Sequence, residues 1–449
     1  MSRTARQVWL AGVAALCAVT LFAALREGRG AETRPTLNDT PANWLLASEV
    51  ADGALDRDTP KRFELWRAAY AHAKLLAPLR ANTDAAFVRA GLFHWYELPG
   101  QDRARVLKAA EPLMADPDFF ARMSIPLLQL TRDFTWIRTH APKRLDTRGA
   151  LRDLAISRGL FGEYRALRDE VRAMRLQSFQ ARRRIDDPSA LANMLPDRLD
   201  LQDQPLVQGV LEELDRQAFD PSQVSTRVDE VVTFALDHQL GPLSGVKPLL
   251  EPPSRLRDVT RARVALALGL ATDASRIEMT TATAINAGEW RPYYLERARF
   301  EARRGDARAA NAYLLRAAAK DLTIPVLDAA VDVAHLLRRT SDEQRYLADL
   351  GRAPRAWQGL CGTDEICGSA RADAWARTPR TEKITLANTQ SDETPPYVEI
   401  YAGALRVAEG EVRDQRTFEV PLAAGAQELE VRLVNQRTRN GVQRRVRLL

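Results

Sequence analysis

The stretch from Val8 to Leu25 constrains the whole chain, because it holds eighteen consecutive residues without a charge. A helix rises about 1.5 Å per residue, so this stretch would span roughly 27 Å, close to the hydrocarbon thickness of a bilayer. It is the one stretch of this kind in the sequence. The sequence therefore predicts a membrane anchor at residues 1–30, with a spanning helix at about 8–25 and the rest of the chain on one side of the membrane.

A cleaved signal peptide is the alternative interpretation of this segment. Its apolar part is longer than the usual signal-peptide core of about 7–15 residues, and Gly28-Arg29-Gly30 is a poor cleavage site. Arg residues flank both ends of the stretch, so they do not decide its orientation. A short N-terminal tail usually stays in the cytoplasm, and we therefore expect the body of the chain to lie outside it.

The charge composition gives little support for nucleic-acid binding. The net charge is +6, but 59 acidic residues are interleaved with 65 basic ones, and no large block of one sign stands out. Only seven of the basic residues are Lys, which together with the abundant Ala indicates a GC-rich bacterial genome. With the predicted anchor, this composition is typical of a single-pass protein of the bacterial inner membrane whose bulk is periplasmic.

A helical period runs through residues 42–350, after a linker at 31–41. One example is the apolar stripe Trp66, Ala69, Tyr70, Ala73, Leu76 and Leu79. Further helices are expected at about 83–98, 102–114, 117–131, 148–158, 162–182, 205–218 and 224–239. Pro and Gly residues separate these segments. Helix pairs with short loops over this length predict a mainly α fold, an α-solenoid.

Residues 290–320 are expected to form two helices joined by a tight turn. The first helix carries Tyr294, Ala298 and Phe300, and Gly305-Asp306 makes the turn. The second helix carries Ala310, Leu314 and Ala317. A small residue where the helices cross, a Gly-Asp turn and a following Ala resemble a tetratricopeptide repeat. Residues 151–172 repeat the pattern more weakly, with Gly159 at the turn. The resemblance implies stacked helix pairs that offer a surface to a partner.

The period changes to two in residues 381–449. Alternating apolar residues mark short strands, separated by Gly or Asn turns: Ile384 and Leu386; Val398 and Ile400; Phe418, Val420 and Leu422; Leu429, Val431 and Leu433; Val446 and Leu448. These strands predict a small antiparallel β-sandwich. Residues 351–380 are expected to be a linker.

Two of the three cysteines, Cys361 and Cys367, bracket the segment CGTDEIC. Their spacing does not fit a zinc or redox CxxC motif. In an oxidising compartment a disulfide between them would contribute about 2 kcal/mol by the loop-entropy relation. The alternative is two unrelated thiols in a loop, and we favour the disulfide because it agrees with a body outside the cytoplasm.

Four arginines share one face of the helix expected at 162–182. Arg165, Arg168, Arg172 and Arg175 recur at steps of three and four. Guanidinium groups bind phosphate and uronate groups in a bidentate manner, so this stripe is a candidate contact for an anion or an acidic glycan. The alternative is a solvated face that pairs with Glu163, Asp169 and Glu170 on the same helix.

The strand pattern of residues 381–449 resembles small carbohydrate-binding sandwiches, specifically the calcium-dependent xylan-binding modules. Strands such as PYVEIY and TFEVPL, and a penultimate strand that ends at Asn435, carry the resemblance. The family follows this Asn with an Asp, whereas Gln436 stands here, so calcium binding is not implied. If this region binds an anion or a glycan, four arginines are the candidate contacts: Arg437, Arg439, Arg444 and Arg445. A generic spacer domain is the alternative.

Recognised catalytic motifs are missing from the sequence, which has no nucleophile elbow, phosphate-binding loop, dinucleotide fingerprint or paired histidine ligands. We therefore expect no catalytic residue, cofactor or metal, and predict a non-enzymatic scaffold or adaptor in a cell-envelope pathway such as polysaccharide assembly or export. Its partner would be a protein, a polysaccharide or both. The alternatives are a structural assembly factor of a membrane complex and a glycan-acting enzyme that uses paired carboxylates.

Overall fold

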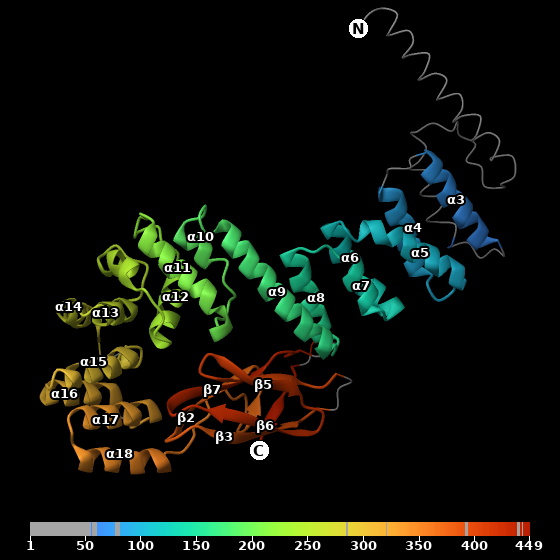
Figure 1. The fold of residues 1–449 in the computed structure, drawn as a ribbon. Coiled ribbons are helices and arrows are strands. Elements are labelled where there is room, and N and C mark those ends of the chain that lie inside the picture. Colours follow the sequence, from blue (N-terminus) through green and yellow to red (C-terminus); the bar gives the residue numbers. More distant parts are fainter. Residues whose placement is uncertain are drawn as a thin grey trace, which may run out of the picture. The chain divides into compact units, whose positions relative to one another are not determined.

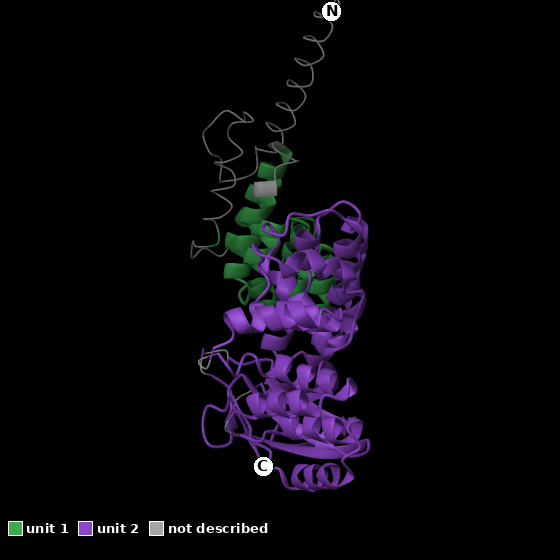
Figure 2. Ribbon diagram, turned by 90° about the vertical axis from the view of Figure 1, so that its left-hand side faces the viewer, with its two compact units in different colours: residues 1–151 green, residues 152–449 purple. Residues whose placement is uncertain are grey.

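The computed structural model describes residues 55, 61–76, 81–283, 286–319, 321–390, 394–437, 441 and 443–449. Across these residues, none of the helices has both the length and the apolar character needed to cross a membrane. The predicted span at residues 8–25 lies outside the described part, as do the rest of the anchor and the linker at 31–41. The chain divides into two compact units, residues 1–151 (unit 1) and 152–449 (unit 2), which Figure 2 colours separately.

Helices form the described part of unit 1. They are α3 (Arg62–Leu76), α4 (Ala81–Phe93), α5 (Gly100–Leu113), α6 (Pro117–Thr131), α7 (Phe134–His140) and the first half of α8 (Leu145–Ser157). Trp66 and Tyr70 lie one turn apart on α3, and both stack on Phe87 of α4, with ring centroids 4.1 and 3.8 Å away. This three-ring stack joins α3 to α4, because each ring buries apolar surface against its neighbour.

Unit 2 begins with a long series of helices (Figure 1). They are α9 (Phe161–Arg182), α10 (Pro188–Ala192), η3 (Leu201–Asp203), α11 (Gln204–Arg216), α12 (Thr226–Asp237), η4 (Ser244–Leu250), α13 (Asp258–Ala267), α14 (Ala271–Thr281), α15 (Arg291–Arg303), α16 (Ala307–Ala318), α17 (Ile324–Leu336) and α18 (Thr340–Arg352). The expectation of a mainly α fold is confirmed, and α6, α9 and α11 match the ranges expected from the sequence to within two residues.

The turn expected at Gly305-Asp306 is present between α15 and α16. Gly305 adopts a φ of +79°, a conformation that favours glycine, and ends α15. Asp306 then caps α16, because its carboxylate accepts the backbone N–H of Ala309 at 2.9 Å. Trp290, Tyr293 and Tyr294 at the start of α15 are buried in the helical core, so they fill space between helices.

Two antiparallel sheets follow the helices. The strands are β1 (Glu365–Ile366), β2 (Ser369–Ala376), β3 (Arg380–Asn388), β4 (Tyr397–Ala402), β5 (Leu405–Glu411), β6 (Gln415–Leu422), β7 (Gly425–Leu433) and β8 (Val446–Leu448). One sheet has the order β1-β8-β3-β6 and the other β2-β7-β4-β5. Apolar side chains from both sheets, including Ile384, Val398 and Val431, form a common core. We call this two-sheet region the sandwich.

The sandwich begins before residue 381. Strands β1 and β2 lie in the stretch 351–380 that the sequence assigns to a linker. The buried positions of β2 are all alanines, Ala370, Ala372, Ala374 and Ala376, so the strand lacks the large apolar residues by which the others are detected.

Strand β4 is buried on both faces, unlike β6, in which buried and exposed residues alternate. Val398 and Ile400 face the core shared by the two sheets. Tyr397, Glu399 and Tyr401 therefore point to the opposite face. Helix α9 covers that face, because the ring of Phe161 stacks on Tyr397 with centroids 4.7 Å apart. The sandwich is thus packed against the helices of unit 2.

We predict that Gly245→Ala destabilises unit 2 by about 1–3 kcal/mol. A Cβ at Gly245 would overlap the backbone of Leu214 and Asp215, which cannot move aside as a flexible side chain can. The free energy of unfolding, measured by urea titration with circular dichroism, tests this. The matched control is Gly162→Ala on α9, where a Cβ meets nothing within 4 Å and stability should be unchanged or slightly higher. Equal stability of the two variants would contradict the packing of η4 on α11.

Candidate functional site at helix α9 and the sandwich

The arginine stripe lies on α9, a helix of 22 residues whose buried side carries Tyr164, Leu167, Val171 and Phe179. The apolar spacing fixes which side of the helix faces the rest of unit 2. Arg168 lies beside this buried side, and its side chain is 14% exposed. Its guanidinium therefore meets the sandwich rather than open solvent.

Glu399 of β4 is the centre of this contact. Only 4% of the residue is exposed, yet four side chains reach its carboxylate. The hydroxyls of Tyr164 and Tyr401 donate to it at 3.1 and 2.9 Å. The Nη1 atoms of Arg168 and Arg406 donate at 3.1 and 3.4 Å. A buried carboxylate is costly unless it is paired, and here two cations and two hydroxyls compensate for its lost hydration.

Glu409 of β5 completes the cluster. Arg168 holds it with two hydrogen bonds, from Nη1 at 2.6 Å and from Nη2 at 3.3 Å. Burial raises the pKa of Glu409, but the hydrogen bond and charge of Arg168 and the charge of Arg406 outweigh it, so the pKa lies below its ordinary value. Burial and the charge of Glu399 raise the pKa of Tyr164 and of Tyr401, so both phenols remain protonated donors.

We call these six residues the Glu399 cluster: Tyr164, Arg168, Glu399, Tyr401, Arg406 and Glu409. A second ion pair lies nearby, where Arg198 contacts the buried Glu430 of β7 and places its guanidinium 4.1 Å from the ring centroid of Tyr401. The cluster and this pair join α9 and the segment before η3 to the sheet β2-β7-β4-β5.

The other arginines of the stripe have different surroundings. Arg172 pairs with Asp200 at 2.6 Å and with Asp203 at 3.4 Å, next to η3. Arg165 is exposed, and Arg175 is half-buried. Burial lowers the pKa of Arg175, as do the charges of Arg152 and Arg172. Arg168 and Arg172 are therefore engaged in ion pairs within unit 2. For Arg165 and Arg175, contact with an anion stays a prediction.

The four C-terminal candidates are also separated. Arg444 is 1% exposed, and its Nη1 donates to the backbone carbonyls of Asn435 at 3.0 Å and Arg437 at 2.7 Å, so its guanidinium braces a loop. Arg445 is exposed and pairs with Glu365 at 3.1 Å. Arg437 is exposed, and Arg439 lies outside the described residues.

Asn435, the residue that carries the resemblance to the xylan-binding modules, is buried. Its side-chain oxygen accepts the backbone N–H of Tyr397 at 2.7 Å, and its amide nitrogen donates to the carbonyl of Pro395 at 2.9 Å. The side chain thus fixes the start of β4. Among the described residues, no group of three or more His, Cys, Asp or Glu is placed to hold a metal ion.

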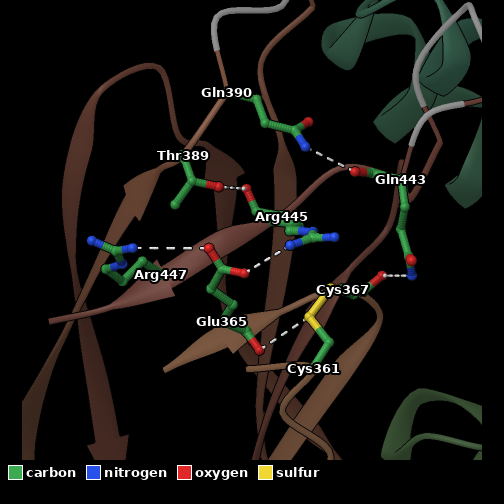
Figure 3. Close-up of a disulfide and its surroundings, with 8 residues drawn as sticks. All are labelled: Cys361, Glu365, Cys367, Thr389, Gln390, Gln443, Arg445 and Arg447. Carbon is green, nitrogen blue, oxygen red and sulfur yellow. Dashed lines mark hydrogen bonds and ion pairs between the residues drawn. A yellow bond between two sulfur atoms is a disulfide. The ribbon is translucent and has the colours of Figure 1, made fainter. Parts of the chain in front are cut away.

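Cys361 and Cys367 form a disulfide with Cα atoms 6.0 Å apart (Figure 3). The loop that they close contains β1, which pairs with β8. Gln443 donates to the carbonyl of Cys367 at 3.1 Å, and Arg445 donates to Glu365 inside the loop (Figure 3). The disulfide loop is thereby tied to the last strand of the chain.

The chemistry of the Glu399 cluster favours a structural role. A pair of carboxylates can hydrolyse a glycosidic bond when one of them has a raised pKa and can donate a proton. Glu409 has a lowered pKa, and Glu399 is buried with four donors directed at its carboxylate. The two carboxylates therefore act as the anions that hold Arg168 and Arg406.

Sequence reasoning found Arg168 and Arg172 but not their acidic partners on β4, β5 and η3. A signal was present in the segment YVEIYA, where Tyr397, Glu399 and Tyr401 alternate with Val398 and Ile400. Bulky residues on both faces of a strand indicate that both faces are covered. Comparison with known protein families, with curated proteins and with solved structures found no match to this chain.

We predict that Arg168→Ala lowers the free energy of unfolding of unit 2 by about 3 kcal/mol, because Glu399 would keep a buried charge with one cation fewer. Urea unfolding followed by circular dichroism measures the change. The matched control is Arg165→Ala, one turn earlier on the same helix and exposed, which should change stability by less than about 0.5 kcal/mol. Equal effects of the two substitutions would contradict the role of the cluster.

Acid should remove the stabilisation that Glu409 provides. Because its folded pKa lies below the ordinary value of 4.5, its contribution is complete above that pH and is lost as the pH falls through the folded pKa. We predict that wild type is more stable than Glu409→Gln at pH 7 and that the difference shrinks below pH 4.5. Urea midpoints measured from pH 7 to pH 3 test this, and a difference that stays constant over the range would refute it.

Proposed function

We propose that this chain is a non-enzymatic scaffold or adaptor of a bacterial cell envelope, anchored in the inner membrane with its body in the periplasm. Polysaccharide assembly or export is the setting that we favour, with a protein partner, a polysaccharide or both bound to the body. The observation that carries this proposal is the seating of the sandwich on α9 through the Glu399 cluster. It makes the helices of unit 2 and the sandwich one body that can present a continuous surface.

The helix pairs support the binding role within this proposal. Helices α13 and α14, α15 and α16, and α17 and α18 follow one another in pairs joined by short turns. Gly269 and Gly305, both at positive φ, close two of these turns. We propose that the pairs form a tetratricopeptide-like solenoid, since such repeats stack to give an extended surface for a partner.

The disulfide supports the periplasmic location. Disulfides form and persist in oxidising compartments such as the bacterial periplasm and are rare in the cytosol. The Cys361–Cys367 disulfide closes a loop of the sandwich, and α9 fixes the sandwich to the helical body. We therefore propose that the scaffold folds in the periplasm, where this disulfide can form.

A topology experiment tests the location. In a bacterial host, alkaline phosphatase fused after Leu449 should be active and green fluorescent protein at the same place should be dark, because the first folds in the periplasm and the second does not when exported unfolded. The chain should sediment with membranes, and a variant without residues 1–30 should not. A fluorescent, cytosolic fusion would overturn the proposal.

A retention experiment then tests the partner. The full chain, purified in detergent from its native envelope, should retain a stoichiometric envelope protein or polysaccharide. Arg168→Ala should reduce this retention and Arg165→Ala should not if the partner needs the joined body. A purified chain that retains neither kind of molecule would contradict the scaffold role.

A further inference from the structure

Unit 1 contains a cavity of ≈ 680 Å³ between α3, α4 and α5. This volume lies within the range of about 300–1,000 Å³ that is usual for small-molecule sites. The cavity is not part of the predicted anchor or of the Glu399 cluster, so neither gives it a role. All residues that line the cavity belong to unit 1, so its geometry does not depend on where unit 2 lies.

The walls of the cavity are mainly apolar. Ala68, Ala71, Ala109 and Pro112 line the cavity together with Phe87, of which 2% is exposed because Trp66 and Tyr70 stack on its ring. Ala71 of α3 and Ala109 of α5 have short side chains, which leave the space between the helices open. An apolar ligand group would therefore exchange water for contact with fixed apolar walls.

The charged residues of the lining are mostly cations. Arg67, Arg105 and Lys108 line the cavity together with one carboxylate, that of Asp84. The carboxylate is already engaged, because Tyr70 donates to it and Lys74 lies 2.9 Å from it. An excess of positive charge thus remains toward the cavity.

Arg67 and Arg105 are both held by one buried carboxylate. The carboxylate of Asp102 is fully buried and pairs with Arg67 at 2.6 Å and with Arg105 at 3.3 Å. A single carboxylate leaves further N–H groups of two guanidinium ions available for a ligand, since each guanidinium has five. Arg105, Lys108 and Ala109 lie on one face of α5, three and four residues apart.

We infer that this cavity binds a small amphipathic anion, with one carboxylate or phosphate head and an apolar body. Arg67, Arg105 and Lys108 bind the head, because guanidinium and ammonium groups form charge-assisted hydrogen bonds with these anions. The apolar body lies against the surface lined by Ala68, Ala71, Ala109 and Pro112. The inference rests on unit 1 alone and does not depend on the proposed scaffold role.

Calorimetric titration of the full chain in phosphatidylcholine nanodiscs tests the inference, with empty nanodiscs as the background. Octyl phosphate and octanoate supply both the head and the body, octanol lacks the charge, and inorganic phosphate lacks the body. We expect octyl phosphate and octanoate to bind at least about tenfold more tightly than either partial probe. If octanol binds as tightly as octyl phosphate, the cavity is merely apolar. If inorganic phosphate binds as tightly, the cavity is a bare anion site. Either result, or no binding of any probe, overturns the inference.

Variants locate the binding. Arg105→Ala combined with Lys108→Ala should weaken octyl phosphate binding about tenfold or more. Arg67 still pairs with the buried Asp102 in this variant, and a circular dichroism spectrum like that of wild type should show that it is folded. Ala71→Phe, at an exposed position, should block the body by filling the space. The matched control is Arg122→Ala, an exposed arginine on α6, which should bind as wild type does. Unchanged binding in both cavity variants would place the ligand elsewhere and refute the inference.

A vesicle experiment distinguishes the two sources of such a ligand. If the anion is a lipid, vesicles that contain phosphatidic acid should bind the chain without residues 1–30 more strongly than pure phosphatidylcholine vesicles, and the Arg105→Ala, Lys108→Ala double variant should lose that gain. If the anion is a free metabolite, octyl phosphate should bind while the vesicles make no difference. Either result supports the site, whereas a vesicle gain that the double variant keeps argues against it.

Discussion

The burial of Glu399 is the constraint on which the arrangement of unit 2 depends. A carboxylate that is 4% exposed persists as an anion only if its lost hydration is replaced. The replacement comes from two elements far apart in the sequence: Tyr164 and Arg168 on α9, and Tyr401 and Arg406 on the sandwich. Separating α9 from β4 would leave the charge half-compensated. The cluster therefore stabilises the packing of the sandwich on α9 and favours this one position over others.

This seating changes how the C-terminal sandwich is to be understood. Helix α9 covers the face of β4 that points away from the shared core, so the sandwich is packed against helices on that side. Asn435 carries part of the resemblance, and Arg444 belongs to the predicted contact site. Both are buried and hydrogen-bonded to backbone groups. Arg437 and Arg445, by contrast, are exposed. A glycan or protein partner of the sandwich would thus meet surfaces other than the face that α9 covers.

Local signals made much of the fold predictable. Pro117 and Gly305-Asp306 mark helix boundaries through the backbone conformations they favour, and those boundaries are where the sequence places them. Strand β2 was not predicted, because its buried residues are alanines, which also favour helices. The arginine stripe was visible, as was the pairing of Arg168 with the adjacent Asp169. The other partners of Arg168, Glu399 and Glu409, lie more than 200 residues away, and no spacing rule connects them. The cavity could not be predicted either, because it depends on how three helices pack.

Native-state hydrogen exchange tests most directly whether the helices of unit 2 and the sandwich form one body. If the Glu399 cluster joins them, the slowest amides of α9 and of β4 and β7 should exchange through openings of the same free energy, and Arg168→Ala should lower both together. Exchange of the strands through a separate opening of lower free energy, unaffected by Arg168→Ala, would show that the sandwich is an independent domain and would contradict the account.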